Sequence, residues 1–210
     1  LGRNYPAYKF TGLIMPLMMV GLLLLLLIRP IVPGGAPFFS AKGPGSQHAP
    51  IIISFAIAFF IGVFAQRTRF CTMGAVRDII LMRDFHLASG VIGLLIFAFL
   101  SNLALGQFNP GFANQPVAHT NQVWTFLGMV LAGLAYALAG GCPGRQLFLS
   151  GEGDIDAGVF VIGMIVGAGF AHNFGIAASP TGIGPWSAFA VIVGLAFCIA
   201  TGFFMRKRIA

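Results

Sequence analysis

Long apolar runs recur along the whole chain, and this feature limits the possible folds more than any other. Each run is about as long as a helix needs to cross a hydrocarbon core of roughly 30 Å. The chain is 58% hydrophobic and 8% charged, whereas soluble domains carry about 25% charged residues. The sequence therefore predicts an all-α polytopic membrane protein and excludes a disordered tail, a nucleic-acid binder and a disulfide scaffold. The expected spans are residues 12–28, 50–65, 86–105, 122–140, 155–174 and 185–204.

Two connectors between these spans, residues 66–85 and 141–154, are too polar to cross a membrane and too apolar to be ordinary loops. Each holds one cysteine near its start, Cys71 in the first and Cys142 in the second. Their apolar stretches predict half-helices that lie at the membrane edge or dip into it. Backbone at that depth is tolerated only where protein or water satisfies its polar groups. We therefore expect about six transmembrane helices and two short half-helices.

The two connectors belong to an internal repeat with a period of about 71 residues. A glycine lies nine residues before each cysteine, Gly62 before Cys71 and Gly133 before Cys142, and a Val-Ile-Gly triplet follows each connector. Each unit has the order helix, cysteine turn, short helix, helix, and such repeats form the substrate path of many transporters. The alternative is chance matching of glycines in a glycine-rich chain, although cysteine, turn and span order match together.

The basic residues predict an orientation, because cytoplasmic segments carry excess Lys and Arg. With Arg206-Lys207-Arg208 placed inside and six spans counted back, ten of the 12 Lys and Arg residues lie inside, and Arg29 and Lys42 lie outside. The C-terminus is thus expected in the cytoplasm, provided that neither connector crosses the bilayer. The expected divisions are a first span with an outer loop at 1–49, repeat unit 1 at 50–120, repeat unit 2 at 121–183 and a last span with a basic tail at 184–210.

The second cysteine motif, Gly-Gly-Cys-Pro-Gly-Arg-Gln at 140–146, has the composition of an anion-binding turn. Gly141 and Gly144 leave backbone amides uncovered, and a proline after Cys142 suits the first position of a helix. Helix N-termini carry about half a positive charge, bind anions and favour thiolates, and Arg145 follows one turn later. The alternative is a buried thiol acting as a small hydrophobe, which does not explain the arginine. We therefore predict a substrate-contacting thiol.

The first cysteine motif, Arg-Thr-Arg-Phe-Cys-Thr-Met-Gly at 67–74, places positive charge before the thiol. Cys71 is the repeat mate of Cys142, and Gly74 allows close approach at the turn. Arg77 is a further candidate for this site. Its alternative role, shared with the neighbouring arginines, is to anchor a cytoplasmic loop by positive charge.

Other polar residues near the motifs are secondary candidates. Glu152 is expected to pair with an arginine of either connector, whereas Asp154 and Asp156 fit a helix start, where carboxylates are favourable. His172 and Asn173 lie near the end of the fifth span. An ionisable group at membrane depth is a functional candidate, and an interfacial cap is the alternative for this pair.

Several kinds of site are not expected. Three cysteines without a close pair argue against a disulfide framework and a zinc site. The third, Cys198, lies in an apolar run and is expected in the core. The sequence shows no paired carboxylates, Ser/His/Asp set or phosphate-binding loop. We therefore expect no metal, no cofactor and no catalytic residue.

These motifs resemble the YeeE/YedE family of bacterial inner-membrane proteins, which are linked to uptake of thiosulfate and related sulfur compounds. The second motif is the more specific one, and the longer stretch that follows it is most similar to the YedE branch, described as selenium transporters. The resemblance rests on Phe-Cys-Thr-Met-Gly at 70–74, Gly-Cys-Pro-Gly-Arg-Gln-Leu at 141–147, Gly-Glu-Gly-Asp at 151–154 and Ala-His-Asn-Phe-Gly at 171–175.

The resemblance implies cysteine loops that meet in the middle of the protein and relay a sulfur-bearing anion to a TusA-like sulfur carrier in the cytoplasm. By motif, Cys142 and Cys71 are relay thiols. Family members often look about twice as long as this chain, so the resemblance also implies a C-terminal half or a short version that pairs with a second copy. It does not separate a sulfur substrate from a selenium substrate.

Sequence and resemblance together predict an inner-membrane transporter or channel for a small sulfur- or selenium-containing anion. In this reading Cys71 and Cys142 contact the substrate, and Arg145 attracts it. The rival hypothesis is a membrane-bound sulfurtransferase in which one cysteine forms a persulfide. A third is a membrane scaffold whose cysteines are packing residues.

Overall fold

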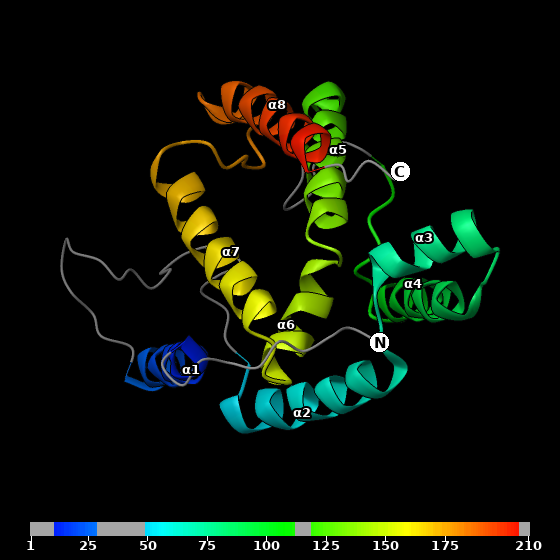
Figure 1. Cartoon of the computed structure of the whole chain (residues 1–210). Coiled ribbons are helices and arrows are strands. Elements are labelled where there is room, and N and C mark those ends of the chain that lie inside the picture. Colours follow the sequence, from blue (N-terminus) through cyan, green and yellow to red (C-terminus); the bar gives the residue numbers. More distant parts are fainter. Residues whose placement is uncertain (1–10, 29–48, 112–118, 206–210) are drawn as a thin grey trace. The chain divides into compact units, whose positions relative to one another are not determined.

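The computed structural model describes residues 11–28, 49–111 and 119–205, and in this part of the chain the regular elements are all helices (Figure 1). The prediction of an all-α polytopic membrane protein is confirmed, since five helical segments are long and apolar enough to cross a membrane. The helices are α1 (Thr11–Ile28), α2 (Ile51–Thr68), α3 (Thr72–Met82), α4 (His86–Ala104), α5 (Gln122–Leu138), α6 (Pro143–Gly151), α7 (Ile155–Asn173) and α8 (Ser187–Phe204).

The membrane-length segments follow the predicted spans with one refinement. The apolar stretch of α2 continues through α3, as Ile51–Met82, and that of α5 continues through α6, as Gln122–Gly151. The other three are α4, α7 and α8. The first predicted span corresponds to α1, whose apolar part, Leu13–Ile28, is shorter than these five. The charged ends used to predict orientation, including Arg206-Lys207-Arg208, lie outside the described residues.

Two short helices occupy the two cysteine connectors, as predicted. α3 has 11 residues and α6 has 9. The order long helix, cysteine, short helix, long helix therefore occurs twice, as α2–α3–α4 and as α5–α6–α7. How deeply α3 and α6 enter the membrane stays a prediction.

The chain forms two compact units. The first combines the residues up to Arg69 with Leu147–Gly158, and the second combines Phe70–Gln146 with the residues from Val159 onward. Within the first unit, Gly158 at the start of α7 lies against Met15 of α1, because a Cβ on this glycine would be 3.5 Å from Met15 Cγ. The second unit contains both Cys71 and Cys142.

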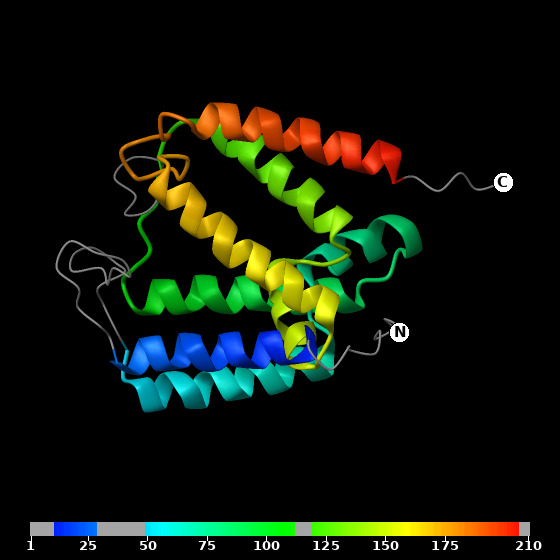
Figure 2. The ribbon, with the colours of Figure 1, turned by 60° about the vertical axis from the view of Figure 1, so that its left-hand side comes forward.

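Helices α5 and α8 of the second unit pack side by side (Figure 2). Gly194 of α8 makes this approach possible, since a Cβ there would lie 2.7 Å from Leu131 Cδ2 of α5. Further along the same contact, a Cβ on Gly202 would lie 3.7 Å from Leu138 Cδ2. Apolar side chains gain little by leaving lipid for another helix, so membrane helices associate through close packing. Small residues at the contact permit this close packing.

Helix α3 packs on α4 through the face that begins with its cysteine. The buried residues Gly74, Ala75 and Asp78 follow Cys71 at helical spacing and so share one side of α3. Ala88 of α4 is also buried. This small-residue face holds the start of α3 close to α4.

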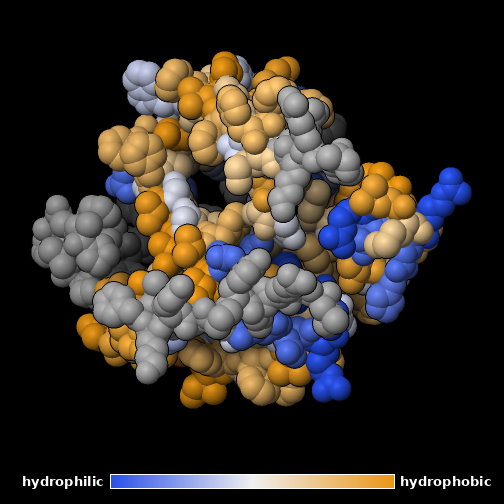
Figure 3. Space-filling model, in the orientation of Figure 1, coloured by the Kyte–Doolittle hydropathy of each residue, from blue (hydrophilic) through white to orange (hydrophobic). Residues whose placement is uncertain are grey.

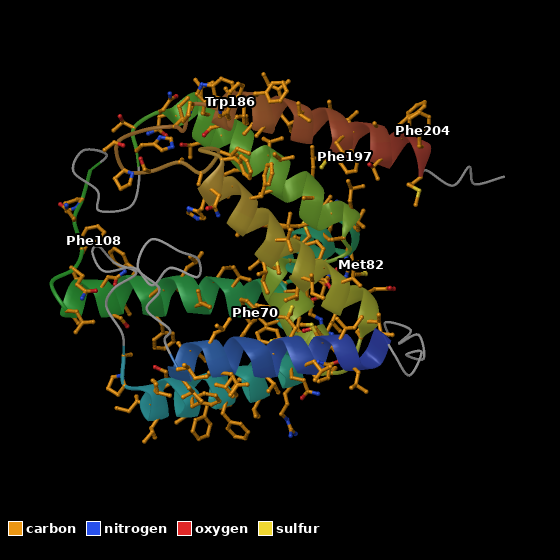
Figure 4. All side chains as sticks on the ribbon, turned by 90° about the vertical axis from the view of Figure 1, so that its left-hand side faces the viewer. Phe70, Met82, Phe108, Trp186, Phe197 and Phe204 are labelled. Carbon is orange, nitrogen blue, oxygen red and sulfur yellow. The ribbon has the colours of Figure 1, made fainter. Side chains whose placement is uncertain are left out.

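Large hydrophobic side chains remain exposed along the helices. Phe197 and Phe204 of α8, for example, are 70% and 82% exposed (Figure 4). Hydrophobic side chains also make up much of the helical surface seen in Figure 3. Such a surface is unfavourable in water and suits contact with lipid tails, as expected for membrane-spanning helices.

Candidate functional site

The first half-helix starts at a cysteine. Cys71 is the N-cap of α3, with an extended backbone, and its Sγ accepts a hydrogen bond from the Gly74 N–H at 3.2 Å. Its carbonyl accepts a hydrogen bond from the Ala75 N–H at 3.0 Å. An oxygen of Ser, Thr, Asp or Asn usually makes the side-chain bond at this position. The thiol therefore lies at the positive end of α3.

Gly74 leaves the room that this thiol occupies. A Cβ on Gly74 would lie 3.2 Å from Cys71 Cβ, 3.4 Å from Cys71 Sγ and 3.1 Å from Leu87 Cδ1 of α4. Any larger side chain would press on the sulfur from one side and on α4 from the other. The close approach expected at Gly74 thus has a defined partner, the Cys71 side chain.

The second half-helix has the same beginning. Cys142 directly precedes Pro143, the first residue of α6, and its Sγ accepts a hydrogen bond from the Arg145 N–H at 3.4 Å. Its carbonyl accepts a hydrogen bond from the Gln146 N–H at 3.1 Å. Only 4% of the Cys142 surface is exposed. The sequence prediction that a proline would open this helix is confirmed.

The backbone before each cysteine supports the internal repeat. The residue two positions before Cys71 is Arg69, with φ 51°, and the residue two positions before Cys142 is Gly140, with φ 73°. Left-handed backbone is easy for glycine and unfavourable for arginine. Its occurrence at both positions shows that the same chain reversal precedes both half-helices.

The two thiols approach each other within the second unit. The Cys142 thiol interacts with the Cys71 side chain, and it also interacts with the backbone N–H and the side chain of Thr72, the first residue of α3. The start of α3 therefore contributes to the surroundings of both cysteines. Thr72 was not among the predicted site residues, and the signal for it was its place directly after Cys71.

The starts of α3 and α6 supply backbone donors to the two thiols. Arg145 follows Cys142 by three residues, and its Nη1 atom is buried. Gly141 lets the Gln146 side chain come close to the backbone, since a Cβ on Gly141 would lie 3.3 Å from Gln146 Nε2. Gly144 lies half-buried in the first turn of α6. Such a group of N–H and S–H donors is suited to a small anion.

Arg77 of α3 has a partner on its own helix. Its Nη2 atom lies 2.8 Å from Asp78 Oδ1, and its Nε atom donates to the same oxygen at 2.9 Å. The Asp78 side chain is 10% exposed, whereas that of Arg77 is 56% exposed. Arg77 therefore neutralises a buried carboxylate, a role that sequence analysis did not anticipate.

The remaining candidates lie at helix ends elsewhere in the chain. Glu152 is exposed in the turn between α6 and α7, and Asp154 Oδ1 accepts a hydrogen bond from the Ala157 N–H at 3.0 Å. The expected helix-start role of Asp154 is thus seen. His172 is exposed in the last turn of α7, and Asn173 Nδ2 donates to the Gly169 carbonyl at 2.7 Å within the same helix.

All three cysteines are free thiols, and Cys198 is buried in α8, as its apolar run predicted. Among the described residues, no cluster of three or more His, Cys, Asp or Glu side chains could hold a metal ion.

Comparison with known proteins relates the chain to sulfur transport. The profile of a family described as sulphur transport matches residues 67–206, a range that includes both cysteine motifs. The thiosulfate transporter TsuA of Spirochaeta thermophila is 35% identical over 102 residues, which are 46% of this chain and 29% of that transporter. The chain thus matches less than a third of TsuA. No solved structure matches the chain.

Proposed function

Because the chain belongs to the sulphur-transport (YeeE/YedE) family, we propose that it takes up a small sulfur- or selenium-containing anion, such as thiosulfate, across a bacterial inner membrane. The observation that carries this proposal is the approach of Cys142 to Cys71 and Thr72 at the starts of two half-helices. Cys71 and Cys142 contact the substrate, and Arg145 attracts it. Gly74, Gly141 and Gly144 let the backbone approach the substrate closely.

The physical chemistry of the site supports an anion path. An anion is costly to bring into a bilayer, and helix N-termini, an arginine and polarizable thiols offset part of that cost. The bonds from Gly74 and Arg145 to the two sulfurs show that backbone N–H groups point to this place. Substrate oxygens or a terminal sulfur take the same donors as they pass. No bond is made or broken in this step.

The proposed path ends at a carrier protein. A TusA-like sulfur carrier on the cytoplasmic side receives the anion, and the basic C-terminus lies on that side. Consumption of the anion there supplies the direction of transport. Binding of purified carrier to membranes with and without the chain tests this part, and equal binding to both would contradict it.

The length of the chain bears on how the path is completed. Only 29% of TsuA is matched, and each cysteine repeat supplies one thiol. We propose that a second copy of the chain, or a separate half, completes the path. Cross-linking in membranes followed by mass determination tests this idea, and a purely monomeric, transport-competent chain would contradict it.

Transport itself is tested with radiolabelled thiosulfate and selenite in cells that lack other importers. We expect uptake to fall at least roughly tenfold for Cys142→Ala and Cys71→Ala, since each loses a substrate contact in an apolar site. Cys198→Ala is the matched control, because Cys198 is an equally buried thiol on α8, outside both motifs. Full uptake by Cys142→Ala would overturn the proposal.

Peptide mass spectrometry of the same cells separates the transporter from the sulfurtransferase. In the sulfurtransferase reaction the Cys142 thiolate attacks the outer sulfur of thiosulfate, the bond between the two thiosulfate sulfurs breaks and sulfite leaves. The Cys142 peptide then gains the mass of one sulfur atom. Unmodified Cys142 together with uptake supports transport. A stable persulfide without uptake would replace the transporter by the enzyme.

A further inference from the structure

A buried glutamine spans the break between α5 and α6. Gln146 lies in the first turns of α6 and is 6% exposed, and its Nε2 atom donates a hydrogen bond to the Ala139 carbonyl at 2.9 Å. Ala139 is the C-cap of α5, seven residues earlier. The side chain therefore reaches back over the whole turn that carries Cys142.

The end of α5 explains why this bond is needed. Gly140 has φ 73°, its N–H donates to the Ala137 carbonyl at 3.3 Å, and the Gly141 N–H donates to the Tyr136 carbonyl at 3.1 Å. This is the Schellman arrangement, in which glycine reverses the chain and pairs two of the last carbonyls. The Ala139 carbonyl follows those two, and the Gln146 side chain supplies its donor. The last carbonyls of a helix lack partners within the helix and need such donors.

The same residue also holds the other side of the turn. The Gln146 backbone N–H donates to the Cys142 carbonyl at 3.1 Å. Its side chain fits because Gly141 has no Cβ, which would lie 3.3 Å from Nε2. Gln146 thus bonds to the residues that precede and follow the Gly140-Gly141 pair, and it closes a ring around the cysteine backbone.

The first repeat lacks this device. The residue at the matching position of α3 is Ala75, which makes the corresponding backbone bond to the Cys71 carbonyl but has only a methyl side chain. The two cysteine turns are therefore fixed differently: the Cys71 turn relies on its packing against α4, and the Cys142 turn has an additional polar clamp.

We propose that Gln146 is a positioning residue that holds the Cys142 thiol in its place opposite the start of α3. The effect of Gln146 on transport rests on the proposed function. The placement of the Cys142 thiol does not, and it can be measured in a chain that transports nothing. Loss of the clamp frees the Gly140-Gly141 turn, and the thiol becomes more accessible.

The test is the rate at which N-ethylmaleimide alkylates each cysteine in the membrane-embedded protein, measured by peptide mass spectrometry. For Gln146→Leu, which keeps the bulk and removes the donor, we expect the ratio of Cys142 to Cys71 alkylation rates to rise about tenfold or more, since small displacements change reactivity strongly. Gln146→Asn, with the amide one methylene short, should give a smaller rise. A merely structural role would lower the amount of folded protein and leave this ratio unchanged.

Gly141→Ala provides a second, independent variant. Its new Cβ displaces the Gln146 amide, so it should raise the same ratio, and the double variant Gly141→Ala/Gln146→Leu should add little to either change. Ser150→Ala is the matched control, because Ser150 is a similarly buried residue of α6 whose hydroxyl bonds to the Leu147 carbonyl within the helix. A ratio within about twofold of the wild type in both Gln146→Leu and Gly141→Ala would overturn the proposal.

Transport is read separately. If Gln146 positions the thiol on a working path, Gln146→Leu raises the KM for thiosulfate uptake while protein abundance stays at the wild-type level. An altered alkylation ratio in a chain that moves no anion would uphold the positioning role and contradict the proposed function. An unaltered ratio in a chain that takes up thiosulfate would overturn the positioning role and support the proposed function.

Discussion

Cys71 and Cys142 occupy the same position in two half-helices, and the Cys142 thiol approaches the Cys71 side chain. Each sulfur accepts a hydrogen bond from the backbone N–H three residues further along. The two half-helices thereby bring together two cysteines that are 71 residues apart in sequence. On the proposed path, a substrate that contacts one thiol is already close to the other.

This approach predicts that the two cysteines form a disulfide on oxidation. Disulfides need Cα atoms about 4.4 to 6.8 Å apart, so the reaction reports proximity. With copper phenanthroline and dioxygen as oxidant, the two thiols lose two protons and two electrons, and one S–S bond forms. Non-reducing peptide mass spectrometry should show a Cys71–Cys142 peptide and none with Cys198. If both thiols still react fully with maleimide after oxidation, the approach of the two thiols is contradicted.

The close contact of Gly74 with the Cys71 side chain predicts a variant that loses function but keeps its stability. Gly74→Ala favours the helix by up to about 1 kcal/mol, but its Cβ would press on the Cys71 side chain and on Leu87. We expect thiosulfate uptake to fall severalfold while the thermal midpoint in detergent changes little. The control is Gly90→Ala on α4, where the nearest atom, on Phe70, is 3.9 Å away. Leu87→Ala should restore part of the uptake, and no restoration would show that α4 is not the obstacle.

The helices themselves were predictable because apolar length is written directly in the sequence. All six predicted spans coincide with helices to within a few residues, and both half-helices follow from the connectors between them. The helix start beside Cys142 was also predictable, since the proline that follows suits a first helical position. Cys71 was identified as its repeat mate, but the bond that each sulfur accepts from the backbone was not predicted.

The details of the site depend on the path of the backbone, which composition does not specify. Thr72 reaches Cys142 only because two segments 70 residues apart in sequence are brought together. Gln146 reaches Ala139 only because Gly140 reverses the chain. A glutamine near a break between membrane helices is a signal that can be read from sequence. Its partner is a backbone carbonyl, and the sequence does not indicate which of the nearby carbonyls it bonds.

Packing of α5 on α8 predicts a graded response at Gly194. A Cβ there would lie 2.7 Å from Leu131 Cδ2, the mobile end of a side chain. Gly194→Ala should therefore be tolerated, whereas Gly194→Val should lower stability by about 1–3 kcal/mol through overpacking. Unfolding in detergent measures both, with Gly163→Ala on α7 as control, because a Cβ on Gly163 meets nothing within 4 Å. Leu131→Ala should relieve Gly194→Val, and additive losses would contradict direct contact.

The Arg77–Asp78 pair predicts unequal effects of removing its two members. Arg77→Gln leaves the buried Asp78 carboxylate without its cation, which should lower stability by about 1–3 kcal/mol. Asp78 is buried on the face that packs on α4. Asp78→Ala removes the buried charge and leaves an arginine that is 56% exposed, so it should lower stability less, by about 1 kcal/mol. Chemical unfolding of both variants in the same detergent gives the comparison. A larger loss for Asp78→Ala would contradict this role of Arg77, and a selective loss of uptake in Arg77→Gln, at unchanged stability, would return Arg77 to the anion site.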